Sequence, residues 1–354
     1  EALEVVLACH PDLILLDIMM PVMDGFSVLI RLKADPSTRD IPVIIISASS
    51  DMHSVIKGIK MGAEDFLPKP FEPTLLLARV SSSLEKKRLR DLEKQYLQSL
   101  EREFEIASEI QQSFLPHELP VLDGWQIATK LKPAREVAGD FYDAFLLPDG
   151  NLVLVVGDVC GKGVGAALFM TLFRSLIRAT ATSNIGCVRQ KTEVDPKALL
   201  RRVITFTNEY IADVHGDVNM FATLFAAIIP RTTDKVAYVN CGNEPCLLVH
   251  GGKITSSLRP SGPVLGVFPG VDFKVSEFSM TSGDMLVAYT DGITDCLDKE
   301  NNSFGYERLA RVVESSFDTP NALLCGIMGE LEDFSSGVAQ FDDITLLAAR
   351  KQEK

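Results

Sequence analysis

The sequence predicts an α/β segment at the start of the chain, then a helical linker, then a second domain rich in strands. Over residues 1–80, apolar runs typical of strands alternate with helical patterns. Residues 81–114 contain neither proline nor glycine, and their apolar residues recur every three or four positions, as on a long helix. The rest is mostly strand patterns with some helical stretches. A chain of 354 residues suits two domains with a linker, which we place at 1–80, 81–115 and 116–350.

Composition narrows the class of protein. The formal net charge of −13 disfavours nucleic acid and anionic membrane surfaces as partners. No apolar run reaches the length of a membrane span, and the start does not resemble a signal peptide. The seven cysteines form no C-x-x-C pair and the five histidines no H-E-x-x-H motif, which favours a reducing, cytoplasmic location without structural zinc. Because the chain begins with glutamate and not methionine, we expect a fragment.

Three strand ends in the first segment carry side chains suited to handling a phosphoryl group. The strand patterns end in Asp17, Ser47 and Lys69. In a parallel sheet these ends would meet at one edge, where α/β proteins bind ligands. The alternative is an ordinary α/β edge without function. The expected elements are strands at 12–17, 42–47 and 65–69 and helices at 25–34 and 52–61.

The stretches LLDIMMPVMDG, IIISAS and FLPKPF resemble the receiver domain of bacterial response regulators. The resemblance implies that Asp17 is the phosphoacceptor, that Ser47 senses the phosphoryl group and that Lys69 is its cationic partner, before a cis Pro70. It also implies a cognate histidine kinase as a partner. The first strand of the family, with its acidic pair, is missing, so the remaining strands would leave an uncovered sheet edge. We therefore expect inefficient phosphorylation of Asp17.

An apolar seam follows the linker helix at a spacing close to the coiled-coil period. Charged residues flank the seam throughout. One alternative is a single solvated helix packed on its own domain, but a long polar helix with one apolar stripe more often pairs with a partner helix. We therefore expect a parallel homodimer through the linker. The seam consists of Leu89, Leu92, Tyr96, Leu100, Phe104, Ala107, Ile110 and Phe114.

Acidic residues at predicted strand ends form the candidate site of the second domain. Asp158 follows the apolar run 152–156, and Asp291 ends a strand in the same way. Asp140 and Asp342 each lie at the start of a strand. Carboxylates gathered without Lys or Arg between them repel one another unless cations lie among them. The pattern therefore predicts a site of oxygen ligands for Mg²⁺ or Mn²⁺.

Two alternatives explain the glycine loop that follows Asp158. The glycines could merely close a tight turn, with Asp158 as a helix cap. Residues 161–166 also fit the G-x-G-x-x-A fingerprint of dinucleotide-binding enzymes. That fingerprint requires a second strand ending in an acid about twenty residues later, where this chain is polar, and Asp158 would repel the phosphates.

The ordered set GDFYD, GDVCGKG, MFATLF, NCGNEP, GPVLGV, YTDGITD and DDITLL resembles the metal-dependent serine/threonine phosphatases related to protein phosphatase 2C, and more closely their bacterial SpoIIE/RsbU type. The likeness covers about residues 104–350. It implies an αββα sandwich of two packed antiparallel sheets, and two Mn²⁺ or Mg²⁺ ions that activate a shared water. The implied ligands are Asp140 on one ion, Asp291 and Asp342 on the other, and Asp158, assisted by the Val159 carbonyl, between them.

Other residues near these acids have less certain roles. Asp343 is expected to be a hydrogen-bonding neighbour of the site. Arg135 could bind the phosphate bidentately or be only a surface charge, and Lys162 could simply be solvated. The sequence departs from the family at Cys160, where animal members have a histidine, and at Asn243, where the bacterial group usually has one.

The resemblance implies hydrolysis of phosphoserine or phosphothreonine on a partner protein, controlled by the receiver through the helical linker. By analogy, the substrate would be a phosphorylated anti-sigma-factor antagonist. The alternatives are a catalytically silent regulator that binds a partner with the same fold and, with less support, a dinucleotide-binding enzyme. The second domain is expected to have strands at 125–131, 144–147, 152–156, 222–229, 236–241, 247–250, 285–289 and 344–348, helices at 166–180, 196–214, 306–317 and 321–334, and a surface loop at 183–195.

Overall fold

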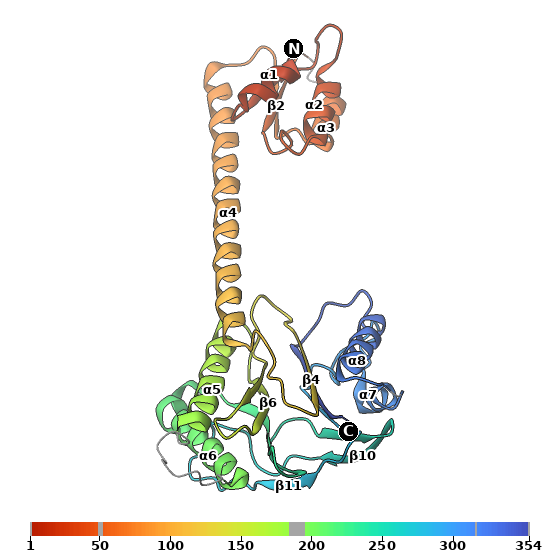
Figure 1. Ribbon diagram of the computed structural model, residues 1–354. Coiled ribbons are helices and arrows are strands. Elements are labelled where there is room, and N and C mark those ends of the chain that lie inside the picture. Colours follow the sequence, from red (N-terminus) through yellow and green to blue (C-terminus); the bar gives the residue numbers. More distant parts are fainter. Residues whose placement is uncertain (1, 49–51, 184–194, 316, 353–354) are drawn as a thin grey trace. The chain divides into compact units, whose positions relative to one another are not determined.

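The computed structural model describes residues 2–48, 52–183, 195–315 and 317–352. The chain forms two compact units, Glu1–Glu103 and Phe104–Lys354, each of which is considered by itself (Figure 1). The predicted surface loop at 183–195 lies almost entirely outside the described residues.

The first unit is built on a parallel three-stranded sheet in the order β1-β2-β3. Helix α2 begins where the Asp24 side chain accepts a hydrogen bond from the Ser27 backbone at 2.8 Å. The core contains the fully buried Leu29, Ile44 and Leu67. The elements are α1 (Ala2–Cys9), β1 (Ile14–Asp17), α2 (Gly25–Ala34), β2 (Val43–Ser47), α3 (Met52–Lys60), β3 (Asp65–Pro68) and the start of α4 (Pro73–Phe114).

The strands and helices of this unit confirm the α/β prediction, with α1 as an element that the sequence pattern did not predict. Strand β2 lies between two neighbours, whereas β1 pairs on one side only within the described residues. Leu15 of β1 is accordingly 43% exposed. The expected open sheet edge is therefore present in this structure.

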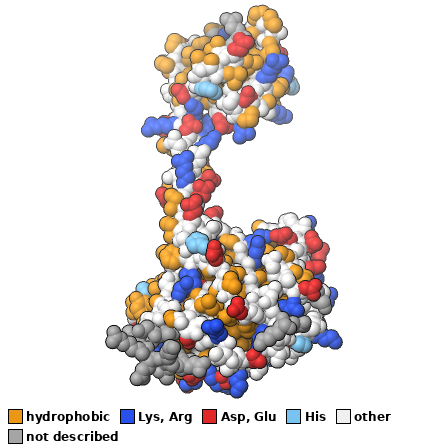
Figure 2. Space-filling view, viewed as in Figure 1, with side chains coloured by type: hydrophobic (Ala, Val, Ile, Leu, Met, Phe, Trp, Pro, Cys, Tyr) orange, Lys and Arg blue, Asp and Glu red, His pale blue; other side chains and the backbone are white. Residues whose placement is uncertain are grey.

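Helix α4 is a single helix of 42 residues. It begins at Pro73, eight residues before the predicted start at 81, because proline is well tolerated in the first turn of a helix and does not mark a break here. Its seam residues Leu89, Leu92 and Tyr96 are 58%, 51% and 65% exposed. Figure 2 shows hydrophobic and charged side chains together along this helix. The homodimer remains a prediction.

The second unit is a sandwich of two five-stranded antiparallel sheets covered by helices on both outer faces (Figure 1). This confirms the αββα prediction. The first sheet has the order β11-β8-β7-β6-β5 and the second β10-β9-β12-β13-β4. The first comprises β5 (Phe141–Leu146), β6 (Leu152–Val159), β7 (Ala222–Ile229), β8 (Lys235–Cys241) and β11 (Ser276–Ser279). The second comprises β4 (Trp125–Lys132), β9 (Cys246–His250), β10 (Lys253–Leu258), β12 (Met285–Tyr289) and β13 (Ile344–Lys351).

Alternation along β6 explains why that strand is apolar at every position from 152 to 156. Val153 and Val155 pack under the helices of the first sheet, whereas Leu154 and Val156 pack between the sheets. Burying each such side chain contributes about 1.5–3 kcal/mol relative to exposure. The helices are α5 (Val164–Ser183) and α6 (Pro196–His215) on the first sheet, and α7 (Gly305–Val313) and α8 (Pro320–Phe334) on the second, with the short 3₁₀ turn η1 (Gly216–Val218) after α6.

Two short strands were not predicted, β10 and β11, because both are edge strands with largely exposed polar residues. Strand β6 continues to Val159, so Asp158 lies within the strand and not beyond its end as expected.

The expectation about membrane spans also needs correction. Among the described residues, α5 is long and apolar enough to cross a membrane. Its buried face, which includes Met170 and Phe173, packs in the sandwich core, so composition alone misleads here.

Candidate functional site

Asp140 and Asp158 are brought together by the pairing of β5 with β6. Phe141 pairs with Gly157 in this antiparallel register, so Asp140 and Asp158 form the next pair. The Val159 backbone donates to the Gly139 carbonyl at 3.4 Å and closes this end of the ladder. A Cβ on Gly139 would lie 2.9 Å from the Val159 carbonyl oxygen, so glycine is what allows this approach.

Asp291 and Asp342 are brought together by the pairing of β12 with β13. The ladder ends with Tyr289 opposite Leu346, after which the Thr290 backbone donates to the Thr345 carbonyl at 3.1 Å. Gly292 makes the turn possible, since a Cβ there would lie 1.9 Å from the Asp343 carbonyl oxygen.

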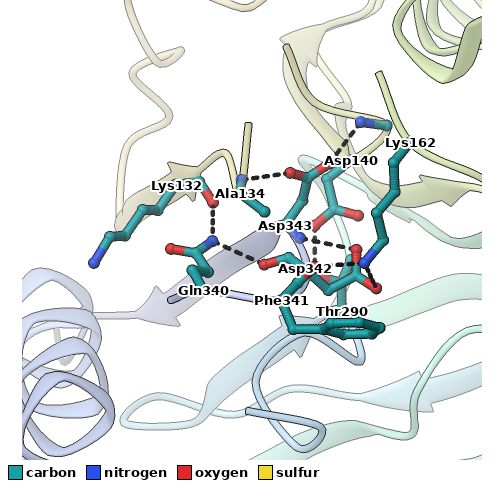
Figure 3. Close-up of polar contacts among 10 residues, drawn as sticks. Lys132, Ala134, Asp140, Lys162, Thr290, Gln340, Phe341, Asp342 and Asp343 are labelled. Atoms are coloured by element: carbon teal, nitrogen blue, oxygen red, sulfur yellow. Dashed lines mark hydrogen bonds and ion pairs between the residues drawn. The ribbon is translucent and has the colours of Figure 1, made fainter. Parts of the chain in front are cut away.

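Hydrogen bonds join the two pairs of acids across the sandwich (Figure 3). The Thr290 hydroxyl accepts from the Thr345 backbone at 3.0 Å and donates to Asp140 Oδ2 at 2.6 Å. The buried Asp343 accepts from the Ala134 backbone at 2.7 Å and from the Gly139 backbone at 2.6 Å. Asp343 is thus confirmed as a hydrogen-bonding neighbour of the site, and both sheets meet at one edge.

The acids are held where their charged forms are unfavourable. Burial raises the pKa of Asp140 well above its ordinary value, and the charge of Asp158 adds to the effect. Burial raises the pKa of Asp158 to about 7, with the charge of Asp291 as the next cause. Burial, and then the charge of Asp342, also raises the pKa of Asp291. Such a set of carboxylates is stable as anions only with cations among them.

The donor set fits a hard divalent cation, since every candidate side chain offers carboxylate oxygens. The side chains do not yet surround a common point. Among the described residues, no three acidic, thiol or imidazole groups lie close enough together to hold one ion. Two acids have other partners. Asp140 accepts from Thr290, and Asp342 Oδ2 lies 3.0 Å from Lys162 Nζ. A bound cation would have to compete with Lys162 for Asp342.

Lys162 lies over the acids and is not merely solvated. Its Nζ contacts Asp342, donates to the Phe341 carbonyl and lies 3.7 Å from the centre of the Phe341 ring (Figure 3). Gln340 holds the same segment through hydrogen bonds of 2.8 Å to the carbonyls of Lys132 and Asp342. Lys162 is therefore a cation that faces this acidic edge.

Arg135 lies in the short loop before Asp140. Its side chain is exposed. Asp343 holds this loop at Ala134 and at Gly139, on either side of Arg135. The loop is thus anchored close to the acids while Arg135 faces solvent.

Cys160 and Asn243, the two positions where the sequence departs from the family, each contact a neighbouring backbone segment. The Phe221 backbone donates to Cys160 Sγ at 3.4 Å, and the sulfur lies 3.7 Å from the Asn219 carbonyl, so Cys160 faces the segment before β7. Asn243 is buried and donates to the Tyr289 carbonyl at 3.0 Å. It therefore supports the strand end that leads to Asp291.

In the first unit, the strand order brings the three expected residues to one edge. Lys69 Nζ lies 2.5 Å from Asp17 Oδ2, and the buried Ser47 ends the central strand between them. The hydrogen bond from Lys69, followed by that from the Met19 backbone, lowers the pKa of Asp17. The Lys69–Pro70 peptide bond is cis, which confirms that prediction.

Three residues near the acidic edge were not predicted. Thr290 follows β12 and binds Asp140, and the half-buried Glu244 adds a further acid whose pKa is raised by burial and by the charges of Asp291 and Asp295. Gln111, near the end of α4, is buried and binds the backbone of Ala138. The available signal for Gln111 was its place seven residues after Phe104, where the seam would favour an apolar residue.

The fold and the acidic edge define a class of protein. A two-sheet sandwich with paired helices outside each sheet is the fold of the PP2C-type serine/threonine phosphatase domains, and that class is metal-dependent. The SiaA-PP2C domain of Pseudomonas aeruginosa shares this fold with a TM-score of 0.59 at 21% identity, covering 72% of this chain and 98% of that domain. Residues 148–352 match the family described as Stage II sporulation protein E (SpoIIE), so the chain belongs to that family. Residues 1–81 match the response regulator receiver domain.

Two curated relatives extend the comparison. Protein IcfG of Synechocystis sp. is 40% identical over 259 residues, which are 70% of this chain and 41% of that protein. Phosphoserine phosphatase RsbU of Bacillus subtilis is 26% identical over 260 residues, 72% of each chain. The chain therefore spans about two fifths of the length of IcfG.

Proposed function

We propose that this chain hydrolyses phosphoserine or phosphothreonine on a partner protein, with two Mn²⁺ or Mg²⁺ ions in the phosphatase site. The observation that carries the proposal is that the buried Asp140 and the half-buried Asp158 and Asp291 lie at one edge of the sandwich, where burial and mutual repulsion raise their pKa values. A purely structural role does not explain why acidic side chains are gathered in a partly buried place, because their charges repel one another there.

The proposed ligands follow from the strand that carries each residue. Asp140 would hold one ion, and Asp291 with Asp342 the other. Asp158, with the Val159 carbonyl, would lie between them, since β6 is the inner of the two paired strands at this edge. When bound, two such cations acidify a water and neutralise charge on the phosphoryl oxygens.

The remaining residues bind and orient the phosphoprotein. Arg135 would contact the phosphate, which is supported by the anchoring of its loop to Asp343 on both sides. Lys162 would exchange Asp342 for the phosphate when the site fills, because its Nζ already faces the acids. No side chain is needed as a nucleophile, and Cys160 faces the segment before β7.

The first unit would regulate this activity. We propose Asp17 as the phosphoacceptor, with Ser47 and Lys69 as its switch residues and a cognate histidine kinase as the donor. The 2.5 Å contact between Lys69 and Asp17 supports this role. The output would pass through α4, paired as a homodimer, to a site whose substrate is an anti-sigma-factor antagonist. These roles suit a cytoplasmic protein that binds neither nucleic acid nor membrane.

A second candidate function has one observation in its favour. Lys162 pairs with Asp342, and in the described part of the chain no three ligand side chains converge on a point. This arrangement would also suit a catalytically silent regulator that uses the same fold to bind a partner. The dinucleotide-binding alternative lacks such support, because β6 lies between two antiparallel strands and not in a parallel βαβ unit.

One assay tests the proposal. The chain is incubated with and without Mn²⁺ in the presence of a phosphoserine protein and, separately, an aryl phosphate, and released phosphate is measured. Manganese-dependent release from both substrates is expected. Release from neither substrate, together with no Mn²⁺ binding by calorimetry, would favour the silent regulator. Release without added metal, which persists after chelation, would contradict the metal site.

A further inference from the structure

Two arginines on α5 share the charge of one buried aspartate on β5. Arg178 donates through Nε to Asp143 Oδ2 at 2.9 Å and through Nη2 to Asp143 Oδ1 at 2.6 Å. Arg174 Nη2 lies 3.1 Å from Asp143 Oδ2. Asp143 is 1% exposed and Arg174 is 8% exposed. One carboxylate therefore faces two guanidinium groups, and the cluster carries one positive charge in excess.

Arg174 has a hydrogen-bond donor that its surroundings leave unused. Within the described part of the chain, Arg174 Nε is buried and has no hydrogen-bond partner. Burial lowers the pKa of Arg174; the charge of Asp143 counteracts this effect, and the charge of Arg178 adds to it. A buried polar group without a partner is rare, and it is costly when it belongs to a cation. The position therefore favours an additional acceptor beside Arg174.

Both arginines line a cavity of about 570 Å³ in the second unit. Its other walls include residues 113–118, at and after the end of α4, and Ala144, Phe145 and Leu146 of β5. The Arg178 guanidinium lies 4.5 Å from the centre of the Phe145 ring. A cavity of this volume, with apolar walls and a few polar groups, is typical of a small-molecule site.

The other ionisable residues at this cavity do not offset the excess charge. His117 and Glu118 line the cavity, and both are exposed. The described residues form no ion pair between Glu118 and either arginine, since both arginines pair with Asp143. Water and salt screen an exposed carboxylate, whereas buried charges are screened much less. An anion in the cavity would therefore meet a buried cation that is only partly compensated.

We propose that this cavity is a second ligand site, which binds a small organic anion through Arg174, the anionic group being a carboxylate or a phosphate. Guanidinium groups bind both kinds of oxyanion through charge-assisted hydrogen bonds. Arg174 Nε donates to a ligand oxygen, Phe145 contacts the carbon part of the ligand, and Asp143 holds the two arginines in place. The site shares no residue with the acidic edge and does not depend on phosphatase activity.

The test measures anion binding by the full chain in chloride buffer at constant ionic strength, after metal ions are removed on a chelating resin. Sulfate stands in for a phosphate group, and malonate supplies carboxylates. Calorimetry gives the dissociation constants, and NMR follows the Arg174 Nε–H group. A few charge-assisted hydrogen bonds correspond to a dissociation constant of about 1 mM. Saturable binding of either anion with a shift of the Arg174 signal supports the proposal, and the tighter anion identifies the chemical class.

Arg174→Met is the decisive variant, because it removes the unpaired donor and leaves Asp143 paired with Arg178. It should weaken anion binding by about ten-fold or more. The matched control is Arg202→Met, because Arg202 is exposed on α6 and the substitution removes the same charge from the same domain. This control should bind both anions as the parent does. Thermal unfolding with and without sulfate is measured for all three chains, since sulfate also stabilises proteins without binding to a site.

Several outcomes would overturn the proposal. No saturable binding of either anion by the parent rules out the site. Equal affinity in the parent and in folded Arg174→Met shows that the anion binds elsewhere. Equal stabilisation of these two chains by sulfate shows that Arg174 only neutralises Asp143. If Arg174→Met does not fold, Arg174→Lys replaces it, since lysine keeps the charge beside Asp143 and lacks the Nε–H group; the parent's affinity in that variant is equally fatal.

Discussion

Asp158→Asn should stabilise the metal-free phosphatase domain while it abolishes activity. The pKa of Asp158 rises from 3.8 to about 7 in the folded chain. In the unfolded chain the group ionises near its ordinary value, so between these two pKa values the folded state holds more protons and its stability falls as pH rises. A shift of about three units corresponds to about 4 kcal/mol, of which about 3 kcal/mol develops between about pH 5 and about pH 8. Asparagine does not titrate and escapes this loss.

The chain offers a clean probe for the measurement. Trp125 is the only tryptophan of the sequence and lies at the start of β4, packed against the core between the two sheets. Urea unfolding followed by tryptophan fluorescence therefore reports on the sandwich and not on the first unit. With a chelator present, the gain in stability of the variant over the parent should be about 3 kcal/mol larger near pH 8 than near pH 5. Added Mn²⁺ should stabilise the parent and leave the variant almost unaffected.

Asp213→Asn is the matched control, because Asp213 is exposed on α6 and the substitution removes the same charge from the same domain. It should change neither the pH dependence nor the phosphatase rate. If Asp158→Asn showed the same stability difference from the parent at both pH values, burial would not be raising the pKa of Asp158. If it kept the parent's Mn²⁺-dependent turnover, Asp158 would not be a metal ligand.

Three further predictions follow from the structure. Cys160→Ser should keep the phosphatase rate, whereas Asp291→Asn should be inactive. Loss of activity in Cys160→Ser would point to a thiol nucleophile. If the proposed dimer forms, replacing Leu92 and Leu100 with Glu should split it and shift the rate several-fold, because charges repel across a helical seam. Sedimentation and rate in one dilution series check this, and a monomer with the parent's rate would refute the coupling. Backbone amides at residues 13–16 should exchange faster than those of β2, which has neighbours on both sides; equal protection would mean that another segment pairs with β1.

The acids could be predicted because each follows or precedes an apolar strand, and Asp140, Asp158 and Asp291 also have a glycine beside them. That pattern indicates where a strand ends and where two backbone segments approach closely, and both are local properties of the chain. Gly292 illustrates the point, since the close approach to the Asp343 carbonyl leaves no room for a Cβ. The roles of the acids as metal ligands remain predictions.

The contacts that join the acids could not be predicted, because they depend on register and on partners far apart in the sequence. Thr290 and Asp140 are 150 positions apart, and Gln111 and Ala138 are 27 apart. A glutamine on a charged helix has the composition of a solvated surface, and its burial appears only when the helix packs on the loop. The edge strands β10 and β11 escaped notice for a related reason, since their exposed polar residues carry little of the alternating pattern.

Two free energies indicate what holds the acidic side chains together: the cost of ionising Asp158 and the contribution of one hydrogen bond. The raised pKa of Asp158 corresponds to about 4 kcal/mol of unfavourable free energy when that carboxylate is ionised without a cation. A single hydrogen bond such as that from Gln111 or Thr290 contributes about 1 kcal/mol. No one of these bonds can therefore hold the acids together at neutral pH, whereas cations that relieve the repulsion can.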